Sequence, residues 1–155
     1  MRVLEPWIRE PLTDFVRESA ARLALVMTSS GQVVAQHGFT RSLDVMSAAA
    51  LGAGILATTG ELAALLQSGG SFGAVVHQGH REGVWLAGFD TPRGRWIALV
   101  AFSTESSVGL VRLFFDRFAA QIAATAPADS PPREVLAEGF ERELDRSLHA
   151  LFGER

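Results

Sequence analysis

The sequence predicts an α/β (α+β) sandwich, in which helices cover an antiparallel sheet. Five short runs rich in β-branched and aromatic residues predict strands, and glycine-containing turns join them into a hairpin and a three-strand meander. Runs of helical periodicity stand before the hairpin, between the hairpin and the meander, and after the meander. The central run, residues 45–66, carries no charge between Asp44 and Glu61, which marks it as an unusually apolar helix.

The first elements are a short helix and the hairpin. We expect the helix at residues 11–20, because Pro11 suits the first turn of a helix, where its missing N–H leaves no hydrogen bond unmade. The two strands are expected at residues 22–28 and 32–37, joined by a turn that contains Gly31. The first strand is apolar at nearly every position, which is typical of a strand covered on both faces.

The long central helix is expected to begin at Leu43, capped by Ser42, and to end near Gln67, before Gly69 and Gly70. At about 100° per residue, two apolar faces emerge. Large side chains form one face: Leu51, Ile55, Leu62, Leu65 and Leu66. Small ones form the other, with Met46 and Leu56 at its margins: Ala49, Ala53, Ala57, Gly60 and Ala64.

The two faces predict two different contacts. Large side chains suit packing on a sheet, whereas small ones permit the close approach of a second helix. We therefore expect the leucines to lie against the sheet and the small-residue face to meet a second copy of the chain. On this interpretation Ala53→Arg would break a dimer, because it buries an unpaired charge. The C-terminal tail of the chain is the competing cover for the same face.

The meander and one more helix follow. We expect its strands at residues 72–78, 83–89 and 95–103, with turns at residues 79–82 and 90–94 between them. The last strand is apolar on both faces, as the first is. Residues 107–126 predict a helix with a single apolar stripe, made of Val111, Phe114, Phe115, Phe118 and Ile122.

A change of composition divides the chain after residue 126. Residues 1–126 are expected to form one domain, residues 127–132 a proline-rich linker, and residues 133–155 a C-terminal amphipathic helix. The apolar residues of this helix recur every four positions and are candidates for binding a partner: Leu136, Phe140, Leu144 and Leu148. They need an apolar surface on the same domain, on a second copy, or on a separate protein.

The composition favours a globular protein and argues against several functions. Of 155 residues, 48% are hydrophobic and 20% are charged, a balance that supports a buried core. The net charge of −3 is unlike that of a nucleic-acid binder. The chain has no cysteine, which excludes a disulfide framework, a thiol nucleophile and a cysteine-based zinc site. Its N-terminus lacks the apolar run of a secretion signal, so we expect a cytoplasmic protein. The uncharged window of 16 residues, Val45 to Gly60, is shorter than a membrane span of about 20.

Three features of the sequence suggest functional sites, but the residues around each of them argue against such a site. Residues 52–57 match the dinucleotide fingerprint G-x-G-x-x-A, but a helix-favouring SAAAL precedes them where a strand is needed, so we expect no nucleotide cofactor. His77, His80 and Glu82 lack the convergent spacing of metal ligands. No serine stands in a G-x-S-x-G elbow, so we expect no catalytic residue and no enzyme.

The element order and three stretches resemble the Roadblock/dynein light chain superfamily, and most of all its bacterial members of the MglB type. The stretches are ALVMTSSGQVVAQHG, DVMSAAALGAGILA and ALVAFSTESSVGLVRLFFDRFAAQI. The resemblance covers roughly residues 8–126. It implies a five-stranded sheet of order 2-1-5-4-3, with the long helix on one face and the first and third helices on the other.

The resemblance also implies how the protein acts. Two chains would pair through the long helix and the third strand, which makes these residues the expected dimer interface: Met46, Ala49, Ala53, Leu56, Ala57, Gly60, Ala64, Phe72, Ala74 and Val76. Such a dimer binds a small Ras-like GTPase and stimulates GTP hydrolysis by ordering the GTPase's own residues, without donating an arginine. We accordingly interpret Arg112 and Arg117 as solvated side chains and not as arginine fingers.

Two other functions remain open at this stage. The chain would be a dimeric scaffold if the C-terminal helix recruits other proteins. A small-molecule sensor would use a cavity between the sheet and a helix, although no polar cluster in the sequence indicates a ligand pocket.

Overall fold

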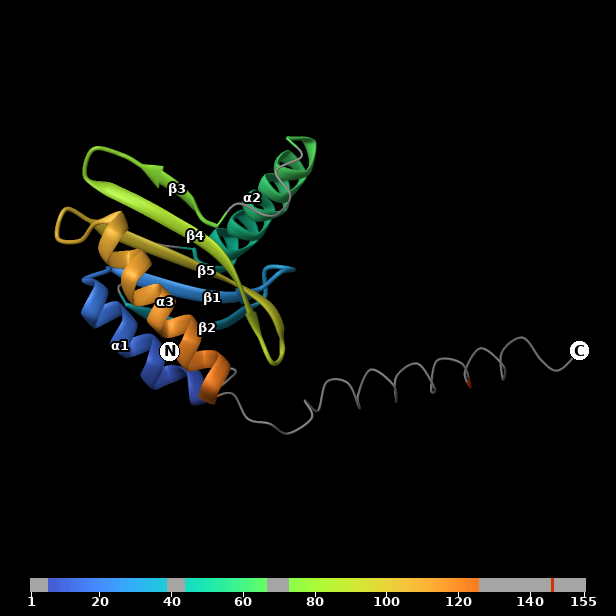
Figure 1. The fold of residues 1–155 in the computed structure, drawn as a ribbon, viewed down its shortest axis with the longest axis horizontal. Coiled ribbons are helices and arrows are strands. Elements are labelled where there is room, and N and C mark those ends of the chain that lie inside the picture. Colours follow the sequence, from blue (N-terminus) through green and yellow to red (C-terminus); the bar gives the residue numbers. More distant parts are fainter. Residues whose placement is uncertain (1–5, 39–43, 67–72, 126–145, 147–155) are drawn as a thin grey trace, which may run out of the picture.

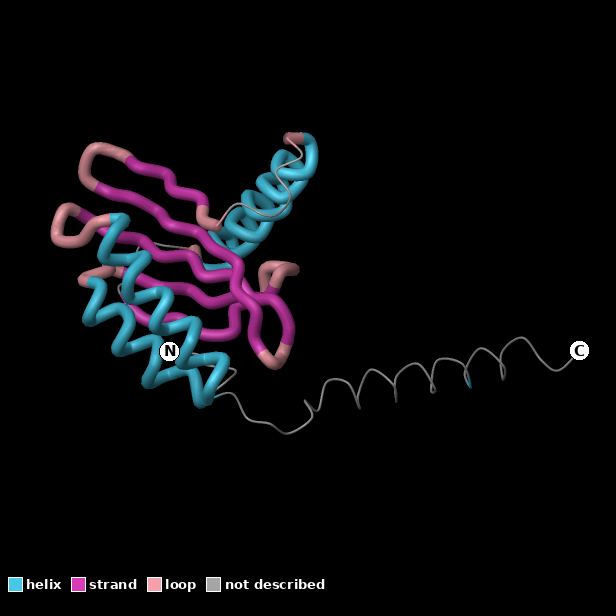
Figure 2. The backbone as a smooth tube through the Cα atoms, viewed as in Figure 1, coloured by secondary structure: helices cyan, strands magenta, loops and turns pink. Residues whose placement is uncertain are grey.

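The computed structural model describes residues 6–38, 44–66 and 73–125 together with Arg146 (Figures 1 and 2). Its helices and strands occur in the predicted order, and their ends lie within three residues of the predicted ones. The elements are η1 (Pro6–Ile8), α1 (Arg9–Ser19), β1 (Leu23–Thr28), β2 (Val33–Gly38), α2 (Val45–Leu65), β3 (Val75–Gln78), β4 (Glu82–Thr91), β5 (Gly94–Ser103) and α3 (Val108–Thr125). The predicted linker and C-terminal helix lie outside the described residues, apart from Arg146.

The five strands form one antiparallel sheet of order β2-β1-β5-β4-β3, which confirms the predicted topology. The hairpin joins the meander through β1 and β5, where Leu25 lies opposite Leu99. Both strands are buried over most of their length, as their two-sided apolar pattern predicted. The sheet therefore has β2 at one edge and β3 at the other.

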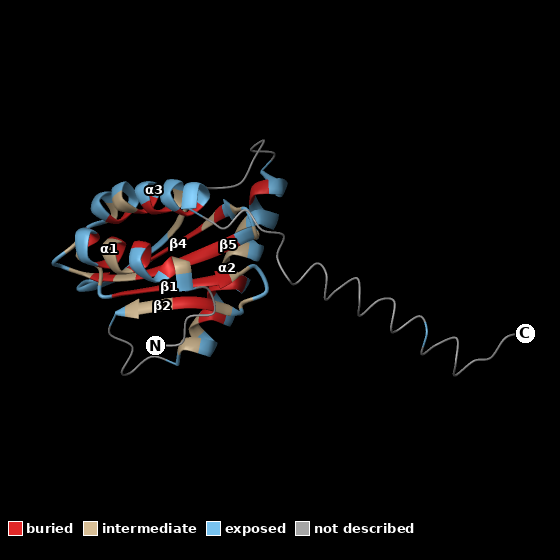
Figure 3. Ribbon diagram, turned by 90° about the horizontal axis from the view of Figure 1, so that it is seen from below, coloured by how far each residue is buried: buried red, intermediate tan, exposed pale blue. Residues whose placement is uncertain are grey.

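Helices cover both faces of this sheet. Helices α1 and α3 lie side by side on one face and α2 lies on the other (Figures 1 and 3). The face under α1 and α3 is packed by aromatic side chains: the Phe115 ring centroid lies 4.4 Å from that of Trp85, and the Phe15 and Phe118 centroids lie 5.6 Å apart. Aromatic burial of this extent supplies much of the hydrophobic stabilisation of a small domain.

Helix α2 begins at Val45, two residues later than predicted. Asp44, and not Ser42, is the cap, because its Oδ1 accepts a hydrogen bond from the Ser47 backbone N–H at 3.2 Å. Its Oδ2 accepts another from the Ser47 hydroxyl at 2.7 Å. The hydroxyl bond and then the backbone bond favour the ionised carboxylate and hold the pKa of Asp44 below its ordinary value. Ser42 itself lies outside the described residues.

The predicted assignment of the two faces of α2 is wrong. Ala49 and Ala53, which we expected to meet a second chain, are buried against the sheet of their own domain, where they are 0% and 8% exposed. The large residues expected on the sheet are instead exposed: Leu51, Leu62, Leu65 and Leu66 are 51–80% exposed. Ile55, of the same predicted face, is half-buried against the sheet.

The reason for the inversion is the size of the side chains on the sheet. On the face toward α2, β1, β4 and β5 carry large side chains, including Met27, Leu86 and Leu99. A Cβ atom added to Gly52 would lie 3.2 Å from a terminal methyl of both Leu86 and Leu99. At the closest approach the sheet therefore leaves room only for glycine and alanine, because large side chains from both sides would not fit there, and Ile55 and Leu56 pack at the margins of the contact.

Among the described residues, α2 is the one helix long and apolar enough to cross a membrane by length and composition. Its inner face, however, is matched to a folded sheet through Ala49, Gly52 and Ala53. We therefore interpret its apolar character as that of a helix that packs on its own sheet and offers its other face to a further protein surface.

The glycine at position 52 is predicted to set the distance between α2 and the sheet. Gly52→Leu should lower the free energy of unfolding by about 1–3 kcal/mol, because the added side chain overpacks the contact with Leu86 and Leu99. Gly60→Leu is the matched control, since nothing lies within 4 Å of a Cβ placed there. The control should be neutral or stabilising through its better helix propensity. Chemical denaturation followed by circular dichroism, at one protein concentration, checks both; equal effects would contradict the packing.

The corrected face assignment makes a second prediction. Ala53→Arg should destabilise the fold itself by about 3–5 kcal/mol, because it places a charge without a partner between α2 and the sheet. Ala123→Arg, on an exposed position of α3, should change the free energy of unfolding by no more than about 0.5 kcal/mol. The same denaturation experiment measures both variants. If Ala53→Arg left stability unchanged and only altered the oligomeric state, the original assignment would be restored.

Candidate protein-interaction surface

The side of α2 that points away from the sheet carries many of the exposed large apolar side chains among the described residues. Its members lie on one side of the helix and are all exposed: Met46, Ala50, Leu51, Gly54, Ala57, Thr58, Glu61, Leu62 and Leu65. We refer to these residues as the outer face of α2. Met46 and Leu65 are each 80% exposed and Leu51 is 68% exposed, which is unusual for large apolar side chains gathered on one helix.

Burial of the outer face of α2 against a partner would cost little desolvation free energy. Its central residues Ala50, Gly54 and Thr58 follow one another at four-residue intervals and are small, so a second helix can come close. The Thr58 hydroxyl donates to the Gly54 carbonyl at 2.8 Å and therefore needs no hydrogen bond from water or from a partner. The one charged residue of α2 is Glu61. The chemistry of this surface is that of a helix–helix contact.

The remaining residues of the predicted interface fall into three groups. Met46, Ala57, Gly60 and Ala64 on α2 are exposed, and Leu56 is half-buried against the sheet. On the strand side, Val76 is 37% exposed and Ala74 is half-buried. Phe72 lies outside the described residues. The structure thus keeps part of the predicted set available and removes Ala49 and Ala53 from it.

Strand β3 is a free edge next to this helix. It is hydrogen-bonded to β4 on one side, and no described strand pairs with its other side. The edge carries Val76, His77 and Gln78 and has neither a proline nor a lysine to discourage pairing. A strand of this kind can extend its sheet by pairing with a strand of another chain.

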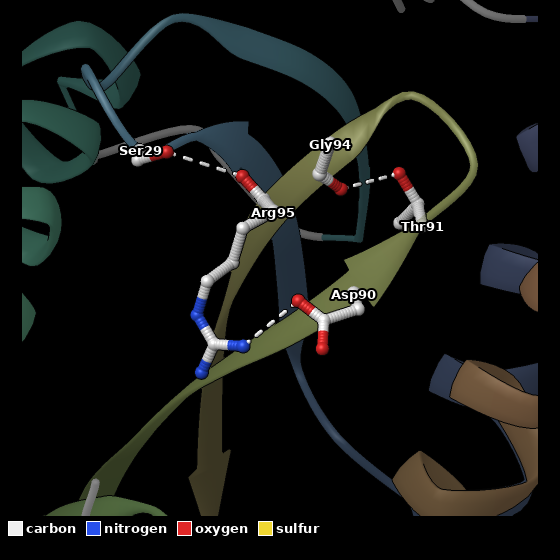
Figure 4. A network of polar contacts seen from close by, with 5 residues as sticks. All are labelled: Ser29, Asp90, Thr91, Gly94 and Arg95. Carbon is white, nitrogen blue, oxygen red and sulfur yellow. Dashed lines mark hydrogen bonds and ion pairs between the residues drawn. The ribbon is translucent and has the colours of Figure 1, made fainter.

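The C-terminal half of α2 diverges from the sheet (Figure 1). A groove lies beneath this part of the helix. Its volume is about 230 Å³, and it is lined by Ser29, Ala53, Leu56, Ala57, Thr59, Gly60, Gly88, Arg95 and Ile97. Arg95 lies across Gly88, where a Cβ atom would come within 2.9 Å of its guanidinium. The same guanidinium pairs with Asp90 at 3.0 Å (Figure 4), so the charge of the groove is largely balanced within the domain.

The polar groups around this groove serve the hairpin turns. The Ser29 hydroxyl donates to the Arg95 carbonyl at 3.2 Å, and the Thr91 hydroxyl donates to the Gly94 carbonyl at 2.7 Å (Figure 4). Gly94 has φ of +111°, which a side chain would strain. The β4–β5 turn is consequently tighter than the predicted 90–94, because the strands continue to Thr91 and resume at Gly94. These bonds explain the polar residues as turn structure.

The other sequence candidates are not brought together into a site. Glu82 pairs with Arg22 at 3.1 Å, while His77 and His80 are exposed. No group of three His, Cys, Asp or Glu residues within the described part of the chain is placed to hold a metal ion. Arg117 is exposed and lies over the Phe114 ring, 5.3 Å from its centroid. The predicted partner-binding residues Leu136, Phe140, Leu144 and Leu148 lie outside the described residues.

Sequence reasoning missed Ala50, Gly54 and Thr58 as members of the exposed surface. The helical projection placed them between the two predicted faces, so neither face claimed them. The signal that identifies them is in the strands. Strands β1 and β5 place large side chains on the sheet, so α2 packs on them through its alanines and glycine, and Ala50, Gly54 and Thr58 face outward.

Comparison with known proteins identifies relatives of the fold. No family model and no curated protein sequence matches the chain. Among solved structures, MglB from Myxococcus xanthus is 25% identical over 76% of this chain and 92% of its own, with a TM-score of 0.68. A structure described as MglB with a tetrameric arrangement is 27% identical over 80% of this chain and 90% of its own, with a TM-score of 0.69.

A more distant structure agrees on the fold alone. The Roadblock/LC7 domain from Streptomyces avermitilis is 16% identical over 73% of this chain and 92% of its own, with a TM-score of 0.62. Together with the sheet order and the helix placement, these matches confirm the resemblance seen in the sequence. The chain therefore has the Roadblock/LC7 fold, with relatives of the MglB type.

Proposed function

We propose that this protein is a non-enzymatic homodimeric regulator that binds a small Ras-like GTPase in the cytoplasm of a bacterium. The observation that carries the proposal is the outer face of α2, which is apolar, exposed and free of unsatisfied hydroxyls. The fold and the 25–27% identity to MglB proteins support it. The dimer is the unit that would present a GTPase with a surface spanning two chains.

In the proposed dimer, two copies of α2 cross at their small residues and two β3 edges pair. Ala50, Gly54 and Thr58 allow the close approach, and Leu51, Leu62 and Leu65 fill the space around it. Pairing of β3 with its copy would join the two sheets into one of ten strands. The tetrameric arrangement of one MglB relative supports self-association of this fold.

In the proposed mechanism, the protein acts by binding and not by donating catalytic groups. A regulator can raise a hydrolysis rate if it binds more tightly to the GTPase conformation in which the GTPase's own residues hold the attacking water. Arg112 and Arg117 both stand on α3, across the sheet from α2, so neither belongs to the surface that the dimer would present around α2 (Figure 1). Binding energy alone is therefore the contribution that we propose.

The dimer makes a direct prediction. Thr58→Arg should convert a dimer into a monomer in size-exclusion chromatography with light scattering, because it places two charges at the centre of the helix contact. The substitution improves helix propensity, so the protomer should keep its far-ultraviolet circular dichroism spectrum. Ala123→Arg, on an exposed position of α3, is the matched control and should remain dimeric. A monomeric wild-type protein at micromolar concentration would refute the dimer.

The GTPase interaction is tested by phosphate release from a bacterial small Ras-like GTPase loaded with GTP. Addition of the wild-type protein should raise the rate by up to about a hundredfold, the part of a total near 10⁵ that an arginine finger does not supply. Arg112→Ala and Arg117→Ala should retain this effect, whereas Thr58→Arg should lose it. A drop of about a thousandfold in an arginine variant would show a donated finger, and no binding at all would remove the GTPase from the proposal.

A scaffold that recruits proteins through its tail gives a different pattern. Leu144→Glu in the full-length chain should then abolish capture of every partner while the dimer persists. Retention of GTPase binding in this variant supports the regulator, and loss of it favours the scaffold.

A further inference from the structure

Helix α3 carries a second apolar stripe that nothing described covers. Its buried stripe, Val111, Phe115, Phe118 and Ile122, packs on the sheet and α1. On the opposite side lie five exposed residues at alternating spacings of three and four: Leu110, Leu113, Arg117, Ala120 and Ala124. We call them the outer stripe of α3. Spacing of this kind is the seam of a helix that packs on another helix along its length.

The outer stripe is graded in size and charge. Leu110 and Leu113 at the beginning of α3 are 39% and 50% exposed, while Ala120 and Ala124 toward its end are small. Between them Arg117 is held over the half-buried Phe114 ring, 5.3 Å from its centroid. The cation has no carboxylate partner among the ion pairs found in the described residues. An occupant of this stripe should therefore be apolar, large where α3 is small, and acidic beside Arg117.

The chain that follows α3 has these properties. The sequence between α3 and the expected tail helix, residues 126–132, contains prolines and is seven residues long, a length within the range that joins neighbouring antiparallel helices. Residues 133–152 would form a helix of about 30 Å, against about 27 Å for the 18 residues of α3. Leu136, Phe140, Leu144 and Leu148 give this segment one apolar stripe. Glu141 and Glu143 would flank that stripe on its two sides.

The hairpin register matches the two stripes. If residue 133 lies beside Thr125, Leu136 and Phe140 come beside the end of α3 that carries Ala120 and Ala124, where space is available. In the same register Leu144 and Leu148 reach Leu113 and Leu110, and Glu141 lies beside Arg117. The largest side chain of the tail stripe, Phe140, thus lies toward the alanine end of α3 and an acidic residue reaches Arg117, without any adjustment of the connection.

We propose that the outer stripe of α3 is the docking site of the chain's own C-terminal segment, residues 133–155, as an antiparallel helical hairpin. The connection starts on the α1 and α3 side of the sheet, so this site is reached by a simple reversal of the chain (Figure 1). The outer face of α2 lies across the sheet and has no cation to receive the two glutamates. Docking on α3 leaves that face free for a second copy.

The absence of cysteine from the chain allows a clean cross-linking test in the full-length protein. Ala120→Cys is combined with Ala137→Cys, which the register places on the docked side of the tail, and the pair is treated with a short bis-maleimide. The control combines Ala120→Cys with Val135→Cys, two residues away on the opposite side of the expected helix. Docking should make the first pair cross-link at least about tenfold faster, because a docked residue has a much higher effective concentration.

Two further variants decide what causes the cross-link. Leu113→Glu and, separately, Phe140→Glu should reduce the rate of the Ala137 pair to that of the Val135 pair. Leu113 is half exposed, so circular dichroism should show the domain still folded. Equal rates for the two pairs in the parent protein would mean an undocked tail and would overturn the proposal. A cross-linked product of twice the chain mass would assign the stripe to a second copy and overturn it as well.

Discussion

The close contact between Gly52 and the leucines of the sheet determines which side of α2 is exposed on the surface of the domain. Because Leu86 and Leu99 fill the space on the α2 side, the helix makes its closest approach with glycine and alanine. Most of the large side chains of α2, including Leu51 and Leu65, then point away from the domain. The apolar outer face of α2 is thus a consequence of core packing. Burial of this face against another protein surface would be favourable in water.

The two faces of the sheet are covered by helices in different ways. Under α1 and α3, aromatic rings such as Phe115 and Phe118 interlock, and two helices share the work of covering them. On the other side a single helix covers the sheet, and it diverges from it toward its C-terminal end. The uneven covering places the apolar surface that remains on the α2 side, next to the free edge of β3.

The topology was predictable from the sequence, whereas the orientation of α2 was not. Strand and helix periodicities are local, and the two-sided apolar pattern of β1 and β5 already indicates central strands. Which side of α2 faces inward depends on the volume of residues such as Leu86, which lies 34 positions after Gly52 in the sequence. A helical projection shows two apolar sides of α2 but contains no information about the volume of the residues on the sheet. The expectation that the leucines face inward was therefore wrong. The cap at Asp44 was missed for a smaller reason, since Ser42 has similar chemistry.

Two helices of this domain have an apolar stripe on the outside as well as the inside, and their differences argue for different partners. The outer face of α2 is small at its centre and contains one charge, Glu61, which suits a symmetric contact between identical helices. The outer stripe of α3 is graded from leucine to alanine around Arg117, which suits an antiparallel helix of unlike sequence and acidic flanks. A symmetric partner must be another copy, while an unlike one is available seven residues farther along the same chain. The two contacts can therefore form together, one on each side of the sheet.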